Sequence, residues 1–157
     1  RLSHFDPGQA VTPTCMDVLL GTLSALPEVA FVYAIQEVTD ASEAFLAAGG
    51  DHLLNAFGWD PGRLRSGNDV HPPALIRIDA LREIGGFTVD ERLDGFEDWD
   101  LWCRMADRGW RGQLVPQLLV RRSGHVASLE IRPTPGPATD LIMERAPRLM
   151  VGAFPPA

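Results

Sequence analysis

A chain of 157 residues, 45% of them hydrophobic and 22% charged, has the composition of one globular domain. Its formal net charge of −7 argues against nucleic-acid binding, which needs a broad basic surface. No apolar run reaches the roughly 18 residues that span a bilayer, and there is neither a secretory signal pattern nor an initial Met, so we expect a cytoplasmic segment of a longer protein.

The first regular elements are predicted to be a helix and a buried strand. Thr12 as N-cap and Pro13 as first helical residue begin a helix that extends to about Leu26. Its apolar face repeats at three- and four-residue spacing and consists of Met16, Leu19, Leu20 and Leu23. Residues 29–38 are β-branched, aromatic and apolar, which is typical of a strand buried on both faces.

The middle of the chain is dominated by a long loop. Residues 52–57 are predicted to form a short helical turn, and residues 60–73 a loop rich in Gly, Asn and Pro. Loops of this length in compact domains are often binding loops. A short strand over residues 74–78 follows, and then a helix over 80–84, capped by Asp79 and ended by two glycines.

A third helix is expected after a loop at residues 88–95. Asp94 and Glu97 have the spacing of a capping box, which predicts a helix to Arg108 with Gly109 as its C′ residue. Residues 114–121 are then predicted to form a strand, and Pro116 within it indicates an edge or a bulge.

We divide the chain into a segment of residues 1–130 and a tail of residues 131–157. The tail contains a Pro-rich linker and a weak helix over residues 139–150. Cys15 and Cys103 are too few for a disulfide framework or a zinc site. Both lie on the apolar side of predicted helices, so we expect buried free thiols.

The stretch most informative about function is an acidic and aromatic cluster at the start of the third predicted helix, which ends at Arg108. Glu97, Asp98 and Asp100 alternate there with Trp99 and Trp102. Adjacent helical residues point in different directions, so one acid can cap the helix while the next faces a cleft. Taken alone, the cluster is also explained by acidic capping and by tryptophans at core spacing.

A longer pattern surrounds this cluster. Gly85-Gly-Phe is followed, after nine residues, by Glu97-Asp98-Trp-Asp-Leu-Trp-x-Arg-x-x-x-Arg108-Gly-Trp. This pattern resembles the second half of the inverting family-2 glycosyltransferases, and the resemblance extends over roughly residues 5–128. It implies an α/β fold: a partial GT-A-like mixed sheet flanked by helices, lacking the N-terminal nucleotide-binding half.

The resemblance also implies an activity and a site. In such enzymes a sugar is transferred from a nucleotide-diphosphate sugar to a glycan or other acceptor hydroxyl with inversion. Asp98 matches the general base of the family, and Glu97 is its neighbour in the catalytic pair. Asn68, His71 and Trp99 are the residues that we expect to line the acceptor site.

A divalent metal, Mn²⁺ or Mg²⁺, is implied as the partner of the leaving diphosphate. Asp6 matches the first acid of the family's Asp-x-Asp signature, and His125 matches its terminal His. Gly8 stands where the second acid is expected and Gln9 where a third is frequent. Hard cations prefer carboxylate oxygens, so this departure weakens the predicted metal site.

Two functional hypotheses follow. The intact Glu97-Asp98 pair favours part of an enzyme that is incomplete alone, whereas the altered signature at Gly8 favours a degenerate, non-catalytic domain that binds a glycan or a protein partner. In either case the missing half would leave an exposed sheet edge, through which we expect the chain to form homo-oligomers.

Overall fold

The computed structural model describes residues 2–4, 9–39, 53–123 and 136–152. They form one mixed sheet in which four strands follow the order β1-β5-β3-β6 and β2 adds to β6, while β4 pairs with β3. The strands are β1 Leu2–His4, β2 Gln9–Val11, β3 Val29–Thr39, β4 Leu53–Leu54, β5 Ala74–Ile76 and β6 Arg111–Ser123. β3 and β6 are parallel, and the other pairings are antiparallel. The predicted α/β class with a mixed sheet flanked by helices is therefore confirmed.

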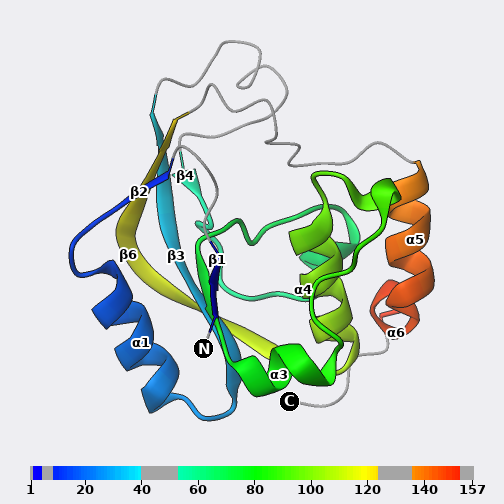
Figure 1. The fold of residues 1–157 in the computed structure, drawn as a ribbon, viewed down its shortest axis with the longest axis horizontal. Helices are drawn as coiled ribbons and strands as arrows, with labels where there is room; N and C mark the ends of the chain where they lie inside the picture. The colour runs from blue at the N-terminus through cyan, green and yellow to red at the C-terminus, as the bar shows by residue number, and fades with distance from the viewer. Residues whose placement is uncertain (1, 5–8, 40–52, 124–135, 153–157) are drawn as a thin grey trace.

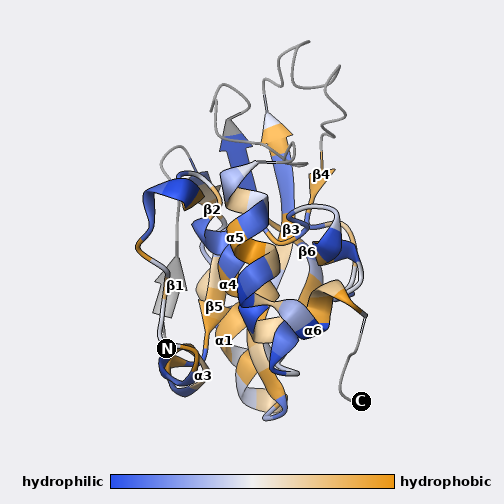
Figure 2. Cartoon of the chain, turned by 90° about the vertical axis from the view of Figure 1, so that its right-hand side faces the viewer, coloured by the Kyte–Doolittle hydropathy of each residue, from blue (hydrophilic) through white to orange (hydrophobic). Residues whose placement is uncertain are grey.

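Helices cover both faces of the sheet. They are α1 Cys15–Ala25, α3 Ile78–Glu83, α4 Glu97–Asp107, α5 Pro137–Arg145 and α6 Pro147–Met150. Figure 1 shows α1 on one side of the sheet and α4 on the other, with α5 and α6 outside α4. Figure 2 shows β5 in apolar colours and hydrophilic residues on turns of α5 that face the viewer. The tail helices thus form a further layer on α4.

The two faces of the sheet have separate hydrophobic cores. Under α1, the core is built from Cys15, Leu19 and Leu23 against strand residues such as Val32. Met16 and Leu20 were expected on the same face, but both are 37% exposed, so the buried stripe of α1 follows strict four-residue steps. Cys15 and Cys103 are both buried and free, as predicted.

The larger core lies between the sheet and α4. Phe31 of β3 stacks on Trp102 of α4, with ring centroids 4.4 Å apart. The buried members of this core also include residues of α3, α5 and α6, such as Leu81, Ile142 and Leu149. Burial of side chains this large is the main source of stability for such a layer.

The predicted helix caps are wrong in position. The N-cap residues are Thr14 for α1, Arg77 for α3 and Phe96 for α4, and none of these three residues makes a side-chain cap hydrogen bond. Asp94 instead ends a short 3₁₀ turn, and Gly95 then takes a φ of +81°. This left-handed residue turns the chain before α4 begins, so Asp94 lies two residues too early to cap it.

Other features of the strands that differ from regular or predicted structure have local causes. Residues 53–54 form β4 rather than a helical turn, because they pair with Gln36 and Glu37 of β3. The register of β3 and β6 jumps from Val115 to Leu118, which places the predicted irregularity at Pro116 as a bulge.

The predicted helix over residues 139–150 is two helices. α5 ends before Ala146, and α6 begins at Pro147, whose ring nitrogen has no proton to continue the helical ladder. The predicted strand over 29–38 and the end of α4 at Gly109, which has a φ of +84°, are confirmed.

Candidate functional site

The predicted catalytic pair lies at the start of α4. Figure 1 shows the start of α4 on the same side of the molecule as the carboxyl ends of β3 and β6. Glu97 and Asp98 form the first turn of α4, and both are half-buried. In open α/β sheets, the carboxyl ends of parallel strands are the usual place for ligands.

The carboxylate of Asp98 is held by hydrogen bonds to both of its oxygens. The side-chain amide of Asn68 donates to Oδ2 at 3.0 Å, and the backbone N–H of Trp99 donates to Oδ1 at 2.9 Å. The amide oxygen of Asn68 in turn accepts from the backbone N–H of Val70 at 3.1 Å. Asn68 is 5% exposed, so its amide is fixed by this network rather than by solvent. The predicted base and one predicted acceptor residue are therefore in direct contact.

Two tryptophans of α4 attach the long loop to the helix. The indole N–H of Trp99 donates to the carbonyl of Leu64 at 2.9 Å, and that of Trp102 donates to the carbonyl of Val70 at 2.7 Å. Trp99 is only 3% exposed. The structure thus places the predicted acceptor residue Trp99 inside the core, as an anchor of the loop that carries Asn68.

His71, in the same loop as Asn68, lies in a buried polar cluster. Its backbone N–H donates to Oδ1 of Asn55 at 2.7 Å, and its carbonyl accepts from the Asn55 amide at 2.9 Å. The Gln36 amide donates to the carbonyls of His71 and Pro72 at 2.8 and 2.7 Å. Gln9 of β2 also donates to the carbonyl of Pro72. These amides hold the loop rigidly to β2 and β3.

The imidazole of His71 is neutral at pH 7. Burial, together with the nearby positive charge of Arg122, lowers its pKa to about 4, although the charge of Asp69 and a hydrogen bond to the Asn68 backbone act in the other direction. A neutral imidazole can both donate and accept a hydrogen bond. His71 therefore links the buried cluster to the segment that positions Asp98.

A second buried network lies behind the site, around Asp100. This side chain is fully buried and accepts hydrogen bonds from Nε of Arg104 and from Oγ1 of Thr88, both at 2.7 Å. Nε of Arg145 lies 3.3 Å from its other oxygen. Arg104 also donates to the carbonyls of Ile84 and Gly86, which closes the Gly-Gly turn onto α4.

This role of Asp100 was not predicted from the sequence, where Asp100 was only one acid of the cluster at the helix start. The signal that could have found it is the Asp–Arg spacing of four residues on a helix whose other side chains are mostly apolar.

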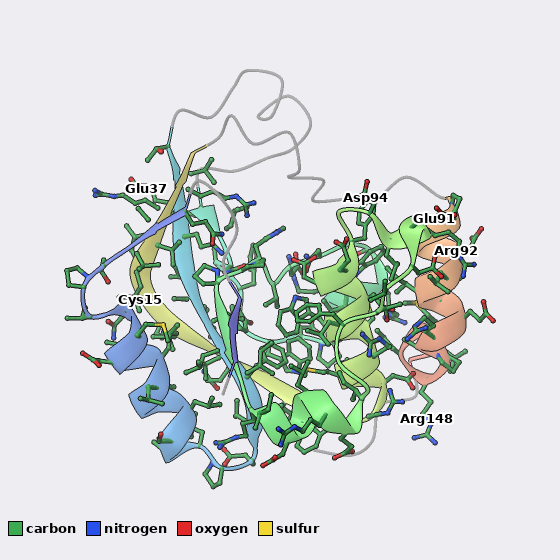
Figure 3. The ribbon with its side chains drawn as sticks, viewed as in Figure 1. Cys15, Glu37, Glu91, Arg92, Asp94 and Arg148 are labelled. Carbon is green, nitrogen blue, oxygen red and sulfur yellow. The ribbon has the colours of Figure 1, made fainter. Side chains whose placement is uncertain are left out.

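The loop between the Gly-Gly turn and α4 forms an acidic hollow. The volume of the hollow is about 520 Å³, and the residues that line it are Thr88, Val89, Asp90, Glu91, Asp94 and Glu97. Figure 3 shows Asp94 above the start of α4, and Glu91 and Arg92 beside α5. Hydrogen bonds from the Arg92 side chain and backbone lower the pKa of Asp90 to about 2. Glu97 thus faces a hollow, whereas its neighbour Asp98 contacts the loop.

The predicted metal ligands Asp6 and His125 lie outside the described residues. Within the described part of the chain, no group of three or more His, Cys, Asp or Glu side chains is arranged to hold a metal ion. In the same part, no helix is long and apolar enough to cross a membrane.

Comparison with known proteins gives no further assignment. No protein-family model matches the sequence, and no curated protein matches it significantly. The functional argument therefore depends on the residues and their geometry.

Proposed function

We propose that this chain is the acceptor-side segment of a family-2-like glycosyltransferase with a partial GT-A fold. It would transfer a sugar from a nucleotide-diphosphate sugar to an acceptor hydroxyl with inversion, and Asp98 would be the general base. The observation that carries the proposal is the half-buried Asp98 carboxylate in the first turn of α4, oriented by Asn68 and by the Trp99 backbone.

The chemistry assigned to Asp98 is one proton transfer. The carboxylate accepts the proton of the acceptor hydroxyl while that oxygen forms a bond to the anomeric carbon of the donor sugar. The bond between this carbon and the diphosphate oxygen breaks, and the nucleoside diphosphate leaves with the bonding electrons. A base must stay within hydrogen-bond reach of the hydroxyl, and a carboxylate fixed at both oxygens has little freedom to turn away.

Asn68 acts in this scheme as a positioning residue rather than as a direct acceptor contact. Its amide oxygen is engaged by Val70, so its amide group is left to donate to Asp98. Glu97 lines the acidic hollow, about 100° around the helix from Asp98. In this scheme Glu97 is the partner acid of Asp98.

A divalent cation, Mn²⁺ or Mg²⁺, would neutralise charge on the departing diphosphate. The candidate donor set is one carboxylate, Asp6, and one imidazole, His125, with Gly8 in place of a second acid. Hard cations take six or more oxygen ligands, so these residues alone do not fit the ion. No step assigned to Asp98 or Asn68 depends on it.

The proposal is tested by Asp98→Asn in the full protein that contains this chain, with transfer from radiolabelled nucleotide sugars as the assay. General-base catalysis is worth about 10²–10⁴-fold, so we expect kcat to fall by that factor with little change in donor KM. Asp79→Asn, an isosteric change on a 94% exposed side chain of α3, is the matched control and should leave kcat unchanged. Retention of more than about a tenth of the activity by Asp98→Asn would contradict the assignment.

The altered acidic signature at Gly8 favours the second candidate, a degenerate domain that binds a glycan or a protein without catalysis. Calorimetric titration with uridine diphosphate and Mn²⁺ separates the two. Saturable binding that is lost in an Asp6→Ala, His125→Ala variant supports the enzyme. The absence of binding by the unaltered full protein supports the degenerate domain.

A further inference from the structure

An aromatic ring with a guanidinium stacked on it lies on the surface near the proposed site. Phe57 is 57% exposed. The guanidinium carbon of Arg63 lies 4.1 Å from the centre of its ring and covers one face. The exposed surface of the ring is therefore its edge and its other face. We call Phe57, Arg63 and Asp69 the Phe57 platform.

The Phe57 platform is held in place by contacts that are independent of any ligand. Arg63 forms a two-point ion pair with Asp69, in which Nη2 lies 3.2 Å from Oδ1 and Nε donates to Oδ2. The phenol O–H of Tyr33, which is buried in β3, donates to the carbonyl of Phe57 at 3.2 Å. An exposed aromatic ring with this support has little conformational entropy to lose when a ligand stacks on it.

The platform is connected to the proposed base through Asn68. Asp69 directly follows Asn68, and consecutive Cα atoms lie about 3.8 Å apart. The side chain of Asn68 donates to Asp98. Asn68 is thus joined to Asp69 of the platform by a peptide bond, and its side chain contacts the proposed base, Asp98.

The charges of the platform select a neutral ligand. Arg63 is the cation that could attract a phosphate, but it is already paired with Asp69, and the pair has no net charge. Arg63 and Asp69 are 40% and 29% exposed, so their remaining donors and acceptors can reach a ligand. A flat apolar surface beside planar hydrogen-bonding groups fits a pyranose, which has an apolar C–H face and a rim of hydroxyls.

We propose that the Phe57 platform binds a neutral pyranose ring of a carbohydrate acceptor, with the ring stacked on the open face of Phe57 and its hydroxyls bonded to Asp69 and Arg63. The role of this carbohydrate as the acceptor of a transfer reaction rests on the proposed function, whereas its binding to the platform does not. An acceptor bound in this way is a glycan rather than a lipid or a protein with a free hydroxyl.

The test is saturation-transfer NMR of the full protein with a panel of neutral disaccharides: maltose, cellobiose, chitobiose, lactose and α-mannobiose. We expect at least one of them to bind, with the strongest saturation on the C–H protons of one ring face. Phe57→Ala should weaken that binding by about tenfold or more, and Phe57→Tyr, which keeps the ring, should leave it within about threefold. Met143→Ala removes a 54% exposed apolar side chain of α5 and should change nothing.

Two outcomes count against the platform. It is overturned if no disaccharide of the panel binds, or if Phe57→Ala binds as tightly as the unaltered protein. Asp98→Asn separates this inference from the proposed function: the variant should lose transfer activity and still bind the sugar. Loss of sugar binding in Phe57→Ala without any transfer activity in the unaltered protein would support the platform and contradict the enzyme.

Discussion

Replacing Asp100 with alanine should destabilise the fold strongly, because it leaves a buried guanidinium without its counter-charge. Arg104 is 3% exposed, and burial already lowers its pKa, with Asp100 as the main opposing influence. Removing one partner of a buried ion pair typically costs about 3–5 kcal/mol. Arg104 keeps its hydrogen bonds to Ile84 and Gly86, so we expect a loss of about 3 kcal/mol in the free energy of unfolding.

Urea denaturation at pH 7 measures this loss as a lower midpoint with an unchanged slope. The control is Asp79→Ala on α3. Asp79 also pairs with an Arg of its own helix, but the two side chains are 94% and 75% exposed and 3.9 Å apart. A surface pair of this kind contributes about 0–1 kcal/mol, so the same substitution should be nearly silent.

A loss of less than about 1 kcal/mol for Asp100→Ala would refute the reasoning, since it would mean that Arg104 finds solvent or another partner. The double variant Asp100→Ala, Arg104→Met gives a second check. It removes both charges, so it should recover part of the loss. A double variant that is less stable than Asp100→Ala would show that Arg104 stabilises the Gly-Gly turn by itself.

Two further predictions concern the core and the loop. Gly112→Ala should cost about 1–3 kcal/mol by urea denaturation, because its Cβ would lie 2.5 Å from the buried ring of Phe31. The control Gly21→Ala, with nothing within 4 Å on α1, should stabilise by up to about 1 kcal/mol, and equal effects of the two would refute the packing argument. The folded-state pKa of His71 is about 4, below the roughly 6.5 of an unfolded chain, so its stabilising contribution is complete above pH 6.5 and is lost as the pH falls towards 4. Between pH 7 and 5, the unaltered protein should lose about 1–2 kcal/mol more unfolding free energy than His71→Gln, and parallel pH profiles would contradict a buried neutral imidazole.

Local sequence patterns were sufficient to predict the structural features that depend only on neighbouring residues. The apolar run of β3, the Gly109 stop of α4 and the bulge at Pro116 were all predicted. Each depends on backbone chemistry or burial that a few neighbouring residues reveal. The misplaced cap at Asp94 was not of this kind, because an intervening 3₁₀ turn and a left-handed Gly95 decided where the helix begins.

The sequence by itself also identified Asp98, Asn68 and His71 as the residues to examine, but it could not say which of them touch. Only the tertiary structure decided that Asn68 holds Asp98, that His71 is buried and neutral, and that Trp99 anchors the loop. These contacts join residues about thirty positions apart in the chain, as between Asn68 and Asp98. They arise because α4 packs its tryptophans onto a loop fixed to β3, and no local pattern encodes a contact that depends on two such surfaces meeting.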